Sequence, residues 1–217
     1  MATATRVRID IPLESGDRLT REEFHRLYEL RPDIKKAELV GGVVYVSSPL
    51  RAKQHGTPHA RIVGWLFDYE SIASDVIIAD NSTVFLSAKD ELQPDACLFR
   101  TDRRARARYD DEGYIEGRPD LVVEVAASSA SYDLHDKKEA YLRAGVPEYI
   151  IWRTLDAAID WFRLSNGKYV LVAPDAQDII ESNQFPGLRL NIAAMLRGDG
   201  RAVHAAMGIG KIAPDRA

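Results

Sequence analysis

The six-residue run Leu121-Val122-Val123-Glu124-Val125-Ala126 constrains the fold of this chain more than any other segment. Its apolar, β-branched composition is typical of a strand that is covered on both faces of a sheet. Because side chains alternate along a strand, Glu124 shares a face with Val122 and Ala126. An ionised carboxylate in such surroundings is costly unless it is paired or bound to a metal. The run therefore predicts a buried strand and a candidate functional residue, Glu124.

Two interpretations of Glu124 fit this pattern equally well. The side chain could pair with an arginine or lie at a sheet edge, since buried ion pairs are a common alternative. It could instead bind a divalent cation together with Asp95, which follows Pro94 and directly precedes the apolar run 96–99. Two carboxylates on neighbouring strands can chelate one hard cation through oxygen. A Pro-Asp pair alone is weak evidence, because it is also common in turns.

A helix is predicted over residues 133–144, capped by its first residue and ended by the glycine that follows it. Lys137 lies three residues after Leu134 and four before Tyr141, so the three side chains share one face of this helix. That face carries the apolar groups that should turn toward the sheet, and Lys138 is nearly as well placed. The alternative is that both lysines are exposed to solvent.

The remaining segments predict a domain that mixes helices and strands. A capping box begins the first helix, and Gly-Gly and Asn-Gly turns indicate two hairpins. Helices are expected at 21–31, 57–67, 133–144 and 193–196, and strands at 38–40, 43–46, 76–79, 83–86, 96–99, 121–126, 148–152, 158–164 and 169–173. Residues 100–118 are expected to form a long polar loop. This order predicts an α/β or α+β fold, with helices on the faces of a central mixed sheet.

The size and composition of the chain suit a single domain with an ample core. The chain has 217 residues, of which 46% are hydrophobic and 29% are charged. We expect an N-terminal extension at 1–18, a domain at 19–198 and a mobile C-terminal tail at 199–217. A membrane span and a secretory signal are not expected. A single cysteine excludes an intrachain disulfide and a cysteine-based zinc site, and these features favour the cytoplasm.

The charge of the chain limits how it could bind nucleic acid. A formal net charge of −4 argues against a broadly basic binding surface, although a local basic cleft remains compatible with it. The arginine-rich run 100–108 is followed directly by acidic residues, so a solvated loop of mixed charge is the simplest interpretation. His55 and His59 are four residues apart, but Pro58 lies between them and no zinc-protease motif is present. The histidines could lie at the mouth of an active site or serve in capping and packing.

These residues together resemble the Uma-type restriction endonuclease family of the PD-(D/E)xK nuclease superfamily. The segments that carry the resemblance extend over most of the chain: Glu38 before the glycine hairpin, Ser48-Pro49, the His59 helix, Gln93-Pro94-Asp95, residues 118–129, Asp133, Lys137, Tyr141, Gly145-Val146, Glu148-Tyr149 and Phe185-Pro186-Gly187-Leu188. The joint set is specific, although no single piece is. The resemblance implies a restriction-endonuclease-like core.

The resemblance also implies an active site. It assigns the two acidic positions of the family to Asp95 and Glu124, and a further acid from an early element to Glu38. The lysine of the family's Glu-x-Lys element would stand at position 126, which is Ala126 in this chain. The resemblance moves this lysine to the following helix, at Lys137. For Glu38 the alternative is an exposed glutamate at a strand end.

The implied chemistry is metal-assisted hydrolysis of phosphodiester bonds, with DNA as the expected substrate. Asp95, Glu124 and the backbone carbonyl of Val125 would hold Mg²⁺ or Mn²⁺, and the metal would lower the pKa of an attacking water. Lys137 would orient that water or stabilise the developing charge. A homodimer is expected by analogy with enzymes that cut both strands. The alternatives are a catalytically inactive nuclease fold that binds nucleic acid, and a structural or regulatory partner in a mobile-element or toxin system.

Overall fold

Two six-stranded sheets organise the residues that the computed structural model describes, which are 12–47, 51–127 and 132–208. The expectations for 1–11, Ser48-Pro49, 128–131 and 209–217 lie outside these ranges. The elements in chain order are α1 (Arg21–Glu29), β1 (Ala37–Val40), β2 (Val43–Val46), the π-helical η1 (Ala52–Gly56), α2 (Thr57–Glu70), β3 (Val76–Asp80), β4 (Val84–Ser87), β5 (Asp90–Leu92), β6 (Ala96–Arg100), β7 (Ala107–Tyr109), β8 (Ile115–Gly117), β9 (Leu121–Ala126), the π-helical η2 (Asp133–Lys137), α4 (Lys138–Ala144), β10 (Glu148–Arg153), β11 (Ala158–Ser165), β12 (Lys168–Leu171), β13 (Ile179–Glu181), β14 (Arg189–Asn191), α5 (Ile192–Arg197) and α6 (Gly200–Met207).

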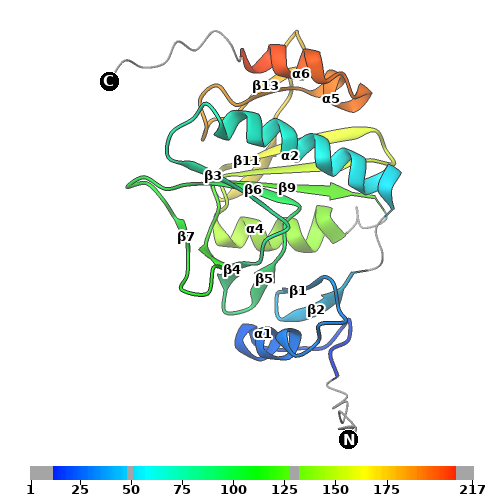
Figure 1. Ribbon diagram of the computed structural model, residues 1–217, viewed down its shortest axis with the longest axis vertical. Coiled ribbons are helices and arrows are strands. Elements are labelled where there is room, and N and C mark those ends of the chain that lie inside the picture. Colours follow the sequence, from blue (N-terminus) through cyan, green and yellow to red (C-terminus); the bar gives the residue numbers. More distant parts are fainter. Residues whose placement is uncertain (1–11, 48–50, 128–131, 209–217) are drawn as a thin grey trace, which may run out of the picture.

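The central sheet has the strand order β12-β11-β10-β9-β6-β3. Strand β9 pairs in parallel with β10 and antiparallel with β6, so the sheet is mixed. Helix α2 covers one face of this sheet and α4 the opposite face, while α5 and α6 lie beyond α2 (Figure 1). This arrangement confirms the predicted mixed sheet with helices on its faces. None of the helices in the described ranges has the length and apolar character needed to cross a membrane.

Strand β9 has the predicted boundaries, and all six of its residues are buried. Val123 and Val125 belong to the hydrophobic core on the α2 side, whereas Val122 and Ala126 belong to the core on the α4 side. The alternation confirms that Glu124 shares the α4-facing side with its small and apolar neighbours. Because β9 is an interior strand, the sheet-edge interpretation of Glu124 is wrong.

The second sheet, of order β2-β1-β5-β4-β8-β7, delivers another acidic residue to the same region. Its β1–β2 hairpin turns at Gly41-Gly42, as predicted, and both glycines have positive φ angles of 60° and 80°. Glu38 lies on β1 and is only 3% exposed. The alternative of an exposed strand-end glutamate is therefore wrong.

Several local expectations are corrected by the structure. The expected loop at 100–118 contains the β7–β8 hairpin, whose short, charged strands lack an alternating pattern. The helix containing Pro58 begins earlier than predicted, because η1 leads directly into it. Tyr132, not Asp133, stands at the N-cap position of η2, and Asp133 is buried. Residues 200–207, expected within a mobile tail, form α6 and bury Met207. The wider division of the chain into extension, domain and tail stays a prediction.

Candidate active site

A cavity of about 530 Å³ lies where β1, the start of β6, β9 and η2 converge. All four residues predicted to be catalytic line it, and so does Val125. Those four are Glu38, Asp95, Glu124 and Lys137, and each is at most 3% exposed. The fold therefore brings together side chains that are separated by up to about a hundred positions in the sequence. Their roles in a reaction stay a prediction.

Asp95 is held by groups from three different segments. Its Oδ2 accepts a hydrogen bond from the backbone N–H of Val125 (2.7 Å) and lies 3.2 Å from Nε2 of His55, while Oδ1 lies 3.4 Å from Nζ of Lys36. Burial alone would raise the pKa of Asp95, but His55, Lys36 and Lys137 outweigh it and hold that pKa below its usual value. Asp95 is therefore an ionised, fixed oxygen donor.

Glu124 stands beside Asp95 in the sheet. The pairing of Ala96 with Val123 in β6 and β9, continued by one residue, sets Asp95 opposite Glu124. Oε1 of Glu124 lies 2.6 Å from Nζ of Lys137 and accepts a hydrogen bond from the hydroxyl of Tyr141 at 2.7 Å.

Lys137 links three carboxylates at once. Besides Glu124, its Nζ lies 3.0 Å from Oε1 of Glu38 and 3.6 Å from Oδ1 of Asp133. The side chain is 2% exposed, which confirms the inward orientation predicted from the helical spacing. Lys138 differs, because its Nζ lies 3.4 Å from the centre of the Phe162 ring, on another part of the surface of α4.

The charges of the cavity do not balance. Four buried carboxylates, which are Glu38, Asp95, Glu124 and Asp133, face two lysines, Lys36 and Lys137, and the exposed Arg51. Burial raises the pKa of Glu124 to about 8, and the neighbouring acids add to the effect while Lys137 opposes it. The buried carboxylates of the cavity therefore outnumber its lysines, even though Lys137 contacts Glu124. A divalent cation held by carboxylate oxygens would add positive charge, so the donor set fits Mg²⁺ or Mn²⁺.

Some residues of the site were not found from the sequence alone. Lys36 precedes Glu38 by two residues, and the period of a strand could have placed both side chains on one face. Asp133 was interpreted as a helix cap, although its i,i+4 spacing to Lys137 permits an ion pair. Tyr141 was assigned only an apolar role. Tyr132 lines the cavity with a buried hydroxyl that has no hydrogen-bond partner among the described residues.

The two histidines both lie against Asp95, with their ring centroids 5.5 Å apart. His55 contacts the carboxylate of Asp95, whereas Nε2 of His59 lies 2.8 Å from the backbone oxygen of Asp95 and 2.7 Å from Oδ1 of Asp80. His59 is therefore bound to groups of the protein, and His55 forms part of the cavity wall.

Replacing Tyr141 with phenylalanine tests the hydrogen bond to Glu124. A bond to a charged group contributes about 1.5–3 kcal/mol. At a pH above the pKa of Glu124, which is about 8, we therefore expect the free energy of unfolding to fall by about that amount. Urea unfolding followed by tryptophan fluorescence measures the change. Tyr149→Phe is the matched control, because its buried hydroxyl bonds the neutral backbone oxygen of Asp133, and its loss should cost about 1 kcal/mol. Equal losses in both variants would contradict an ionised Glu124 as the acceptor.

Comparisons with known proteins agree with this architecture. A family model described as "Uma2: Putative restriction endonuclease" matches residues 21–193. The chain is also similar to the crystal structure of a "putative nuclease belonging to DUF820" from Anabaena variabilis, with a TM-score of 0.58 and 14% sequence identity. That likeness covers 74% of this chain and 89% of the other, and it supports the fold. None of the curated proteins matches the chain.

Proposed function

As the chain belongs to the Uma2 restriction endonuclease family, we propose that it is a metal-dependent nuclease that hydrolyses phosphodiester bonds in DNA. The observation that carries this proposal is the position of Lys137. Its Nζ lies 2.6 Å from Glu124 and 3.0 Å from Glu38, in the cavity that Asp95 also lines. A lysine from the helical segment after β9 thus lies beside Glu124, which supports a role for Lys137 that Ala126 cannot fill.

The residues proposed to hold Mg²⁺ or Mn²⁺ are Asp95, Glu124 and the backbone carbonyl of Val125. Mg²⁺ keeps several water ligands and is usually bound through one or two carboxylates, so this set is sufficient. When bound, the cation supplies a water of lowered pKa and stabilises negative charge on a phosphate oxygen.

The side chains of the cavity have distinct proposed tasks. Lys137 holds the attacking water beside Glu124 and stabilises the charge that develops on the phosphate. Glu38 keeps the ammonium group of Lys137 in place through their contact at 3.0 Å. Lys36 and the unpartnered hydroxyl of Tyr132 are the groups that could bind phosphate oxygens on the cavity wall. The local basic groups allow phosphate binding despite the net charge of −4.

An inactive nuclease fold that binds nucleic acid or acts as a regulatory module is the second candidate. Its specific support is that both metal-binding carboxylates already have lysine neighbours, Lys36 for Asp95 and Lys137 for Glu124. The homodimer and the cytoplasmic location stay predictions.

Cleavage assays with defined metals separate these candidates. We expect the purified chain to nick or linearise plasmid DNA with Mg²⁺ or Mn²⁺ and to lose this activity in EDTA. Asp95→Asn should lower the cleavage rate at least about a hundredfold, because removal of one group that stabilises transition-state charge costs about that much. Single-stranded DNA and RNA are assayed in parallel to identify the substrate. Tight Mn²⁺ binding without cleavage of any substrate would contradict the nuclease and favour the inactive module.

A further inference from the structure

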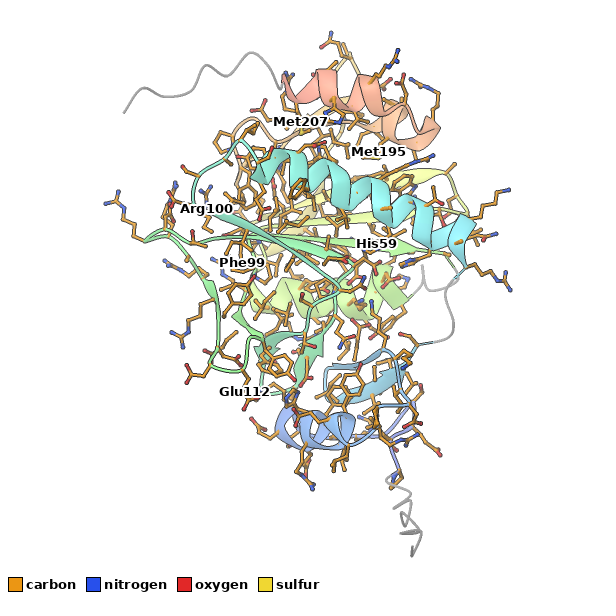
Figure 2. The ribbon with its side chains drawn as sticks, in the orientation of Figure 1. His59, Phe99, Arg100, Glu112, Met195 and Met207 are labelled. Atoms are coloured by element: carbon orange, nitrogen blue, oxygen red, sulfur yellow. The ribbon has the colours of Figure 1, made fainter. Side chains whose placement is uncertain are left out.

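A second cluster of potential metal ligands lies at the other end of the molecule from α6, outside the cavity that contains Glu124. His25 and Glu29 belong to α1, and Glu112 belongs to the turn between β7 and β8. One ligand atom from each of these three residues lies within 4.8 Å of the other two. Figure 2 labels Glu112, which lies beside α1. Two segments far apart in the sequence therefore converge on one point.

The imidazole of His25 is oriented for metal binding. Its Nδ1 lies 2.9 Å from Oε1 of the buried Glu91 on β5, and its Nε2 lies 3.7 Å from Oε1 of Glu29. The contact of Nδ1 with Glu91 leaves Nε2 on the side of Glu29, where an ion would bind. Metal-binding histidines in proteins almost always donate their other ring N–H to a carboxylate or a carbonyl in this way.

The surroundings of His25 fix the orientation of its ring. Phe85 and Tyr114 both pack edge-on against the imidazole, with centroid distances of 5.0 and 4.9 Å. The ring is therefore held between two aromatic side chains and one carboxylate. A preoriented ligand loses little freedom when it binds an ion.

A second observation beside His25 is a buried carboxylate oxygen whose hydrogen-bonding capacity is unsatisfied. Glu91 is only 1% exposed and lines a cavity of about 270 Å³ together with His25 and Glu29. Its Oε2 is buried and has no hydrogen-bond partner among the described residues. Arg31 lines the same cavity, but its guanidinium is bound to Asp33 through Nε and Nη2, both at 2.9 Å.

We propose that His25, Glu29 and Glu112 form a second metal site, which binds Zn²⁺ or a similar transition-metal ion and ties the β7–β8 turn to α1. An imidazole with two carboxylates suits zinc, cobalt or nickel, whereas Mg²⁺ prefers ligation by oxygen alone. In a tetrahedral site with bonds of about 2.0–2.1 Å, neighbouring ligand atoms are about 3.4 Å apart. The His25–Glu29 distance of 3.7 Å requires only a small adjustment. Water would complete the four ligands. This proposal does not depend on the nuclease function.

The proposal is tested by comparing the zinc affinity of the full chain with that of one variant and one matched control. Glu112→Gln removes a ligand on an exposed turn, whereas Asp111→Asn removes the neighbouring exposed charge of the same turn. We expect Zn²⁺ to bind the native chain and Asp111→Asn alike and to raise their melting temperatures. Glu112→Gln should bind this zinc at least about tenfold more weakly. Competitive titration with a chromophoric chelator gives the affinities, and elemental analysis gives the stoichiometry. Because any zinc at the Asp95 cavity is common to all three proteins, the comparison isolates the second site.

The role of Glu91 is tested separately, because this residue would act through His25. Glu91→Gln should weaken zinc binding by about 10–100-fold, as observed for partners of ligating histidines. A purely structural role would lower the melting temperature of the metal-free protein and leave the affinity unchanged. Binding of Co²⁺ should give the visible absorption of a tetrahedral site in the native chain, and this signal should be lost in Glu112→Gln. The proposal is overturned if the native chain binds no zinc, or if Glu112→Gln and Asp111→Asn bind zinc equally.

Discussion

Replacing Lys137 with methionine is expected to lower the free energy of unfolding by about 3–5 kcal/mol. Methionine fills a similar volume, but it leaves Glu124 and Glu38 without the ammonium group that lies within 3.0 Å of both. Removing one partner of a buried ion pair has a cost of this size, because the remaining charge stays in a medium that solvates it poorly. Urea unfolding of the metal-free protein measures the change.

Cleavage by Lys137→Met should also fall, by at least about a hundredfold in protein that is still folded, if this lysine stabilises charge on the phosphate. Lys138→Met is the matched control, because Lys138 is adjacent in sequence and contacts the ring of Phe162 instead of an acid. The control should lose about 0.5–1 kcal/mol of stability and keep its cleavage rate. Full activity of Lys137→Met would contradict the assignment of Lys137 to the catalytic site.

The sequence was sufficient to predict the buried position of Glu124 because strand periodicity is a strong local signal. The alternation of Val123, Glu124 and Val125 follows from the geometry of a strand, and the structure places them on the expected faces. The position of Asp95 opposite Glu124 needs the register of β6 against β9, which is a tertiary property. The sequence separation of Asp95 and Glu124 allowed these strands to be neighbours, and the resemblance to a family favoured that arrangement.

Other parts of the site depend on interactions that no local pattern encodes. Aspartate is a residue type that often caps helices, but Asp133 lies inside η2, after the N-cap residue Tyr132. Its carboxylate lies beside Lys137. The spacing of His25 and Glu29 is visible in the sequence, since both lie on one face of α1. Their proximity to Glu112 arises from a hairpin that was expected to be an irregular loop. Long-range convergence of this kind becomes visible only once the fold is known.

Replacing Glu124 with glutamine should abolish cleavage while leaving the fold intact. Glutamine has the same shape and retains an oxygen that can accept the hydrogen bond of Tyr141. It removes one negative charge from a cavity that has too many, and Lys137 keeps Glu38 at 3.0 Å and Asp133 at 3.6 Å. We therefore expect the stability of the metal-free protein to change by less than about 1 kcal/mol, in contrast to Lys137→Met.

The loss of function should be large, because Glu124 is a proposed ligand of the metal. A loss of about 4 kcal/mol of transition-state stabilisation corresponds to a rate roughly a thousandfold lower. Plasmid nicking in Mg²⁺ and in Mn²⁺, together with Mn²⁺ titration, measures both activity and metal affinity. Glu148→Gln is the matched control, since Glu148 is a buried glutamate on the neighbouring strand β10 that binds Ser182 and Arg163 outside the cavity.

The two glutamine variants should have opposite effects on stability and on cleavage. Glu148→Gln should lose stability but keep the cleavage rate per folded molecule, because its contacts hold β10 to the segment around Ser182. Glu124→Gln should keep stability and lose cleavage. If Glu124→Gln instead cleaves at the native rate, Glu124 is only the partner of Lys137 in a structural ion pair. A loss of stability as large as that of Lys137→Met would show that the cavity does not carry the excess negative charge inferred from its four carboxylates and two lysines.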